Sequence, residues 1–263
     1  MSDSETKSFI RPGKILLLVV LAALVYFAAL VVWVPAGWLW QQVSGKVSLP
    51  PQVVVQQVSG RVWDGAASLV VAGHPVRLDW TLDWPSLTAL ALPVQIDLTS
   101  SRSSLTGSGR IGWPDRGVMN IRGRIGVAEF EDLIRRNGGA VIEGDVVIER
   151  LNLQWVGQRI VSASGIGLWD GGLVTWPMGN QTGQADFPPM EAILDSSQGG
   201  VELTVSQQGG DGPAAGASIS WKGMMKVRVY KRMVDLAGQP WPDSARPGDI
   251  IFQVRQKLLP GAR

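Results

Sequence analysis

The sequence predicts a mainly β protein: an N-terminal single transmembrane helix followed by an antiparallel, curved β-sheet domain with an internal two-fold repeat and one short connecting helix. Three observations predict this. Residues 15–34 carry no charge, apolar and polar residues alternate along much of the remaining chain, and glycine-rich turns separate the alternating runs. Hydrophobic residues make up 45% of the chain and charged residues 17%, a composition typical of a folded protein.

The first apolar segment is long enough to span a membrane. At about 1.5 Å per residue, Ile15 to Val34 covers the roughly 30 Å hydrocarbon core of a bilayer. The nearby basic residues all precede it, at Lys7, Arg11 and Lys14. Residues 1–14 are therefore predicted to be cytoplasmic and the C-terminal part to be outside the cytoplasm. A cleaved signal peptide is the alternative, but bulky side chains follow the span where cleavage needs small ones.

Tryptophans mark the C-terminal end of the span. Trp33, Trp38 and Trp40 are predicted to lie at the membrane interface, where the amphipathic indole ring is favoured. Residues 35–48 are then a juxtamembrane linker between the span and the exported part of the chain.

Alternation with a period of two is clearest between Val76 and Trp84. Every second residue of this run is apolar, and the residues between them are Arg77, Asp79, Thr81 and Asp83. Similar runs occupy residues 94–99, 119–127 and 150–155, and shorter ones residues 201–206, 225–232 and 251–255. One face of each strand is therefore predicted to be apolar and the other polar.

One helix outside the membrane is predicted, from Ala128 to Arg136, because apolar residues fall on one face and Asn137-Gly138-Gly139 supplies a stop. The connecting segment 128–139 separates a first β half, residues 49–127, from a second β half, residues 140–263, whose C-terminal end is less defined. The two halves are predicted to form one continuous curved sheet.

Both halves contain a Trp-Asp-Gly motif, which indicates a weak internal repeat. Its residues are Trp63, Asp64 and Gly65 in the first half and Trp169, Asp170 and Gly171 in the second. Each Asp-Gly pair is predicted to supply a turn, because Gly tolerates a positive φ and Asp can bond its own backbone. These six residues are candidates for a structural motif and a partner contact. Four Trp-Pro pairs, at Trp84, Trp113, Trp176 and Trp241, are predicted to close strands with the indole packed on the sheet.

Residues that common enzymes require are missing or isolated. The chain has no cysteine and one histidine, His74, so the usual thiolate, metal and nucleophile constellations lack components. Asp64 and Asp170 supply the two carboxylates of glycosidase chemistry, but their identical settings argue against the unequal pKa values it needs. No catalytic residue, cofactor or metal site is predicted. The net charge of +2 is too small to indicate a nucleic acid partner.

A basic cluster interspersed with methionines lies near the C-terminus. It contains Lys222, Lys226, Arg228, Lys231 and Arg232, with Met224, Met225 and Met233 among them. Either these cations form the polar face of a strand and its flanking turns, or they form a contact surface, for which flexible thioethers are suited. The sequence leaves both interpretations open.

The chain resembles the family of type II secretion system protein N, also called general secretion pathway protein N. The resemblance covers most of the chain. It is carried by residues 34–38 (Val-Pro-Ala-Gly-Trp), the segment from Leu49-Pro50 through Gly65, and the strand from Val76 to Trp84. The second half agrees more loosely, at residues 144–155 and 164–169.

This resemblance implies a bitopic inner-membrane protein of a Gram-negative bacterium, with a cytoplasmic N-terminus and a periplasmic β-domain. It implies a non-enzymatic component of the machine that exports folded proteins across the outer membrane. The implied partners are the inner-membrane platform proteins L, M and C and the secretin, together with membrane lipid. The oligomeric state stays open.

Two other classes of function compete with this one. A membrane-anchored sheet with a continuously apolar face also suits an AsmA-like lipid-binding groove, if that face lines an open trough instead of closing into a core. An envelope enzyme acting on wall polysaccharide would require a cleft that holds Asp64 and Asp170 in unequal environments.

The predicted topology can be tested by a reporter fusion. We expect alkaline phosphatase fused after Trp40 to be active, because the basic residues before the span hold the N-terminus in the cytoplasm. An inactive fusion, together with an active cytoplasmic reporter at the same position, would contradict the topology.

Overall fold

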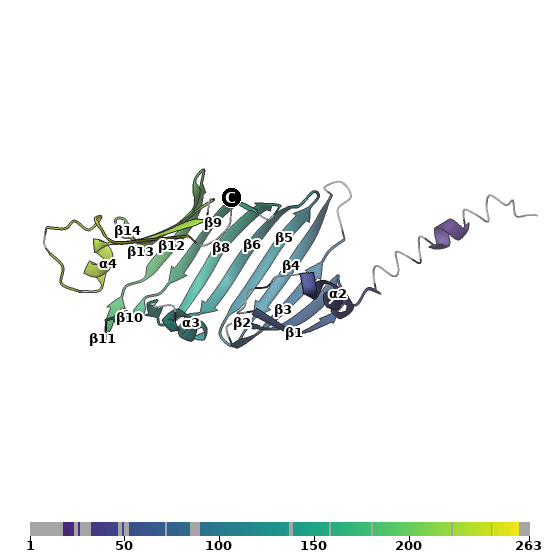
Figure 1. The fold of residues 1–263 in the computed structure, drawn as a ribbon, viewed down its shortest axis with the longest axis horizontal. Helices are drawn as coiled ribbons and strands as arrows, with labels where there is room; N and C mark the ends of the chain where they lie inside the picture. Colours follow the sequence, from purple (N-terminus) through teal and green to yellow (C-terminus); the bar gives the residue numbers. More distant parts are fainter. Residues whose placement is uncertain are drawn as a thin grey trace, which may run out of the picture.

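A computed structural model describes residues 18–23, 26, 33–46, 49, 53–71, 73–84, 90–136, 139–157, 159–179, 181–221, 223–242 and 244–257. Within these ranges the chain forms one large antiparallel sheet of 13 strands and a second sheet of 3 strands (Figure 1). The mainly β, antiparallel prediction is confirmed.

Neighbouring strands of the large sheet follow one another in the chain, with two interruptions, one between β6 and β8 and one between β9 and β12. In sheet order the strands are β1 (Val53–Gly60), β2 (Asp64–Val71), β3 (His74–Leu82), β4 (Ala91–Thr99), β5 (Ser104–Gly112), β6 (Arg116–Gly126), β8 (Asp145–Val156), β9 (Arg159–Trp169), β12 (Met190–Ser197), β13 (Gly200–Gln207), β14 (Pro213–Ser220), β15 (Met224–Tyr230) and β16 (Ile250–Lys257). These interruptions hold the strands of the small sheet, whose order is β11 (Gln181–Phe187), β10 (Gly172–Met178) and β7 (Val141–Ile142). β7 lies between β6 and β8 in the chain, and β10 and β11 lie between β9 and β12.

The predicted connecting helix is present as a 3-10 turn, η2 (Val127–Phe130), followed by α3 (Glu131–Arg136). Two further short helices, α2 (Ala36–Val43) and α4 (Lys231–Leu236), were not predicted, and a 3-10 turn, η1 (Ser44–Lys46), follows α2. α4 begins inside the alternating run that was interpreted as a strand through Arg232. Its Lys231 and Asp235 form a 2.7 Å ion pair one helical turn apart, a pairing that helical spacing permits and strand spacing does not.

The small sheet and α4 cover one end of the large sheet. The closed core there contains Trp169, Val174, Met190 and Ala214, and side chains of α4 pack against it. The Trp169 indole N–H also donates a 2.7 Å hydrogen bond to the carbonyl of Glu143. Among the described residues, no large side chain is fully buried, so this core is small for a sheet of this length.

The prediction that the Trp-Pro indoles pack on the sheet was wrong at three of the four positions. Trp84 and Trp113 are 76% and 81% exposed, and both lie beyond the C-terminal ends of their strands, β3 and β5. Trp241 is also exposed, at 43%. Trp176, on β10, is half-buried against the closed core.

Within the described residues, no helix combines the length and the apolar character that a membrane crossing requires. The predicted span, residues 15–34, lies mostly outside the described residues, which include only residues 18–23, 26, 33 and 34 of it.

The closed core predicts that substitutions of two tryptophans will have very different effects on stability. Trp169→Ala should lower the free energy of unfolding by about 3 to 5 kcal/mol, because it leaves a cavity and an unpaired carbonyl. Trp113→Ala should change it by less than about 1 kcal/mol, because its indole is solvated. Urea denaturation of the purified protein measures both, and equal losses would contradict the assigned core.

Candidate functional site

The first Trp-Asp-Gly motif lies where the connection between β1 and β2 ends: Trp63 is in the connection, and Asp64 and Gly65 begin β2. The turn is closed by the backbone N–H of Arg61, which donates a 2.7 Å bond to the carbonyl of Asp64. The positive φ predicted for Gly65 is found instead at Gly60, where φ is 82°. Gly65 is required for another reason: a Cβ there would lie 2.4 Å from the ring of Trp80.

Two tryptophans, Trp80 and Trp84, contact this motif and the residue before it. The indole N–H of Trp80 donates a 3.0 Å bond to the carbonyl of Val62. Trp63 stacks on Trp84, with ring centroids 6.0 Å apart, and its carbonyl accepts a 2.6 Å bond from the backbone N–H of Leu82. The motif is therefore tied to β3 as well as to β2.

Residues 33–35, at the C-terminal end of the predicted span, contact the connection between β1 and β2 next to this motif. The backbone N–H of Val62 donates a 3.2 Å bond to the carbonyl of Val34, and Pro35 forms an isolated β-bridge with Arg61. The Arg61 guanidinium lies 4.3 Å from the ring centroid of Trp33, a cation–π contact. We call this set of contacts the junction.

α2 lies close against β1 because Gly37 has no side chain. A Cβ at Gly37 would lie 2.8 Å from the carbonyl oxygen of Val58. Of the predicted interface tryptophans, Trp33 and Trp38 are 66% and 55% exposed, and Trp40 is half-buried. Their contact with a membrane stays a prediction.

The second motif has different surroundings. Trp169 is buried in the closed core, Gly171 adopts the positive φ that was predicted, 87°, and Asp170 is exposed. The structure therefore places the two motifs in separate environments, one at the junction and one in the core. In the described part of the chain, no group of three or more His, Cys, Asp or Glu side chains is arranged to hold a metal ion.

A buried carboxylate that the sequence interpretation missed fixes the loop between β4 and β5. Glu129 on η2 is 4% exposed and accepts hydrogen bonds from three serine hydroxyls, at 2.6 Å from Ser100, 2.6 Å from Ser101 and 2.5 Å from Ser103. It also accepts a 2.7 Å bond from the backbone N–H of Arg102. The serine-rich run of residues 100–103 is the feature of the sequence that could have indicated this site. The carboxylate that accepts its hydrogen bonds, however, lies more than twenty residues later in the chain.

These hydrogen bonds determine the charge state of Glu129. Burial on its own raises the pKa of the carboxyl, but the bonds from the three serines and from the Arg102 N–H outweigh it and lower the pKa from 4.5 to about 2. The carboxylate is therefore ionised throughout the physiological pH range.

Apolar side chains from successive strands align on one face of the large sheet, which we call the apolar face. In register, Trp80 lies opposite Ile96 and Ile121 lies opposite Leu151, and all four side chains are half-buried. In the part of the chain that the structure describes, no second layer packs on β4, β5 and β6 (Figure 1). Extended apolar surface of this kind marks an interaction site in soluble domains.

Comparison with models of known protein families gives one match. The family model of type II secretion system protein N matches residues 51–241, a range that begins just before β1 and continues past α4. The chain belongs to this family. The resemblance seen in the sequence is confirmed, and the protein N family is a family of structural secretion-system components. Comparisons with curated proteins and with solved structures give no match.

Membership of the protein N family links the chain to type II secretion and, in general terms, to other components of that system. The matched range contains both the first motif and the apolar face, whereas β16 lies beyond it.

The close packing of α2 on β1 predicts that a larger side chain at Gly37 makes this segment more sensitive to protease. Gly37→Val should separate α2 from β1, because the new side chain cannot fit against the Val58 carbonyl. Limited proteolysis of the full-length protein should then cut residues 35–48 several-fold faster. Gly45→Ala is the control, because a Cβ at Gly45 meets nothing within 4 Å. Equal cleavage of Gly37→Val and wild type would contradict the junction.

The Glu129 site predicts a pH dependence of stability. Its pKa is lower in the folded than in the unfolded chain, so its stabilisation is complete above about pH 4.5 and is lost as the pH falls towards 2. Glu129→Gln should be less stable than wild type by about 1 to 3 kcal/mol at pH 7, and the difference should shrink between pH 4.5 and 2. Urea unfolding at several pH values measures it; a constant difference would contradict the assigned charge state.

Proposed function

We propose that this chain is a non-enzymatic, single-pass inner-membrane component of the type II secretion system, with its sheet in the periplasm as an interaction scaffold. The observation that carries this proposal is the family match over residues 51–241, which coincides with nearly the whole sheet. The predicted partners are the platform proteins L, M and C and the secretin.

The apolar face supports a scaffold role in physical terms. Its side chains are half-buried, so a partner that covered it would remove further apolar area from water at about 25 cal/mol per Å². The junction also supports a scaffold role, because it holds the first strands of the sheet against residues 33–35, at the end of the predicted span.

The same face favours a second candidate function, an AsmA-like lipid-binding groove. The specific observation is the lack of a covering layer over β4, β5 and β6 within the described residues. Acyl chains would be suitable occupants of such a surface, because they offer apolar contact and require no hydrogen bonds.

One purification distinguishes the two functions. The full-length protein, isolated from its native membranes in a mild detergent, should be analysed by mass spectrometry for both proteins and lipids. The secretion role predicts specific recovery of secretion components without stoichiometric lipid. Enriched phospholipid without these proteins would favour the groove instead.

Two adjacent positions supply a matched pair of variants. Ile121 lies on the apolar face and its neighbour Asn120 is exposed on the opposite face. Ile121→Gln should reduce recovery of the bound proteins several-fold, and Asn120→Gln should leave it unchanged. Equal recovery with both variants would contradict the proposal that the apolar face is the contact surface.

A further inference from the structure

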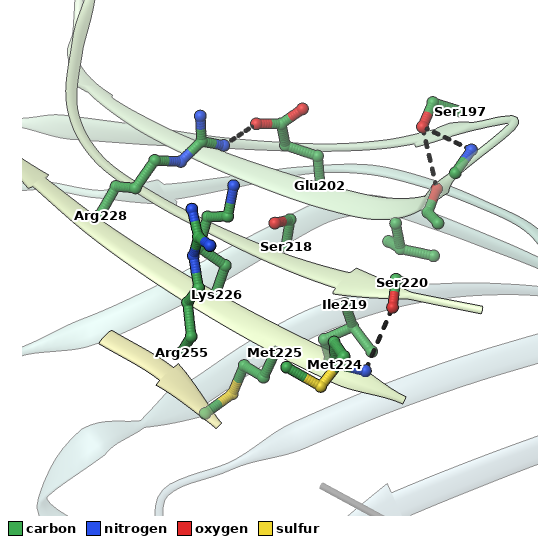
Figure 2. A pocket seen from close by; sticks show the side chains of 13 residues that line it. Ser197, Glu202, Ser218, Ile219, Ser220, Met224, Met225, Lys226, Arg228 and Arg255 are labelled. Carbon is green, nitrogen blue, oxygen red and sulfur yellow. Dashed lines mark hydrogen bonds and ion pairs between the residues drawn. The ribbon is translucent and has the colours of Figure 1, made fainter. Parts of the chain in front are cut away.

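A shallow cavity lies on the polar face of the large sheet, near the end that β13, β14, β15 and β16 form (Figure 2). One row of directly paired residues crosses it. Glu202 is opposite Ser218, Ser218 is opposite Lys226, and Lys226 is opposite Arg255. We call this cavity the basic groove; it includes part of the basic cluster seen in the sequence.

The charges in the basic groove are not balanced. Three cations line it, Lys226, Arg228 and Arg255, with one carboxylate, Glu202, which leaves an excess of two positive charges. Arg228 donates a hydrogen bond to Glu202, so this carboxylate is already engaged. Among the described residues, Lys226 and Arg255 form no ion pair, unlike Arg77 and Arg124 on the same face, which pair with Asp79 and Asp145.

Lys226 and Arg255 repel each other in the sheet as it stands. Like charges directly opposite on neighbouring strands are destabilising. Figure 2 shows both side chains extending to the same side of the sheet, next to Ser218. A shared anion between the two cations would convert this repulsion into attraction.

A phosphate group matches these donors. Its oxygens can accept two parallel N–H bonds from the Arg255 guanidinium, one from the Lys226 ammonium and one from the Ser218 hydroxyl. The Nε of Arg228 is also buried without an acceptor among the described residues, so the groove is rich in donors.

The surroundings of the groove favour a lipid over a free ion. Met224, which lines it, has an apolar side chain that is 43% exposed. Trp221, in the turn between β14 and β15, is 45% exposed. Exposed apolar side chains beside a cationic groove are complementary to an amphiphile, with a charged head and an apolar body.

We propose that the basic groove binds the phosphate of an anionic phospholipid headgroup between Lys226 and Arg255. This site does not depend on the proposed function, because the groove and the apolar face lie on opposite sides of the sheet.

Titration with short-chain lipids tests this site. The full-length protein in a neutral detergent should bind dihexanoyl phosphatidylglycerol more tightly than dihexanoyl phosphatidylcholine or inorganic phosphate. The double variant Lys226→Gln/Arg255→Gln should bind phosphatidylglycerol at least about tenfold more weakly. Its melting temperature should equal or exceed that of wild type, because the repulsion is removed.

The control removes two cations from the same face outside the groove. Arg110→Gln/Arg116→Gln should keep the wild-type affinity within about twofold. Unchanged binding by the double groove variant, or an equal loss in the control, would overturn the site. Inorganic phosphate that binds as tightly as phosphatidylglycerol would overturn the lipid assignment. Should the double variant unfold, Arg255→Gln alone decides, because Arg255 is exposed on the edge strand and its loss leaves the core intact.

Discussion

The cross-strand register of the large sheet is the constraint on which the rest of the structure depends. Because side chains alternate along a strand, and because neighbouring strands are paired in register, the apolar residues of successive strands gather on one face. A shift of one residue in any pair would move its apolar side chains to the polar face. The antiparallel hydrogen bonds thus hold together both the fold and the surface that the protein presents.

The two ends of this sheet are packed against different elements. At one end the small sheet and α4 close a core around Trp169, and at the other the junction joins Val34 and Pro35 to the connection between β1 and β2. Between them, Glu129 and three serines fix the β4–β5 loop to η2 through a buried, ionised carboxylate. Local closure at these points stabilises the sheet, while no described part of the chain covers its middle strands.

Much of the fold follows from the sequence, since period-two alternation reports strand faces directly. The run from Val76 to Trp84 predicted β3, and Asn137-Gly138-Gly139 marked the end of the connecting helix. Contacts between distant residues were not accessible: the different surroundings of Trp63 and Trp169, the packing of Gly37 on β1, and the pairing of Lys226 with Arg255 all require the register. α4 was missed because its six residues directly follow β15 and continue its alternating run, so that no separate helical period stands out.

If the apolar face is a contact surface in the assembled system, a partner should shield it from reagents in solution, and cysteine labelling measures this shielding. The chain has no cysteine, so Ile121→Cys and Asn120→Cys each introduce a single thiol, one on each face. In cells that contain the secretion system, a maleimide should label Asn120→Cys but not Ile121→Cys, and it should label both in the protein purified alone. Equal labelling of Ile121→Cys in cells and in the purified protein would contradict the account.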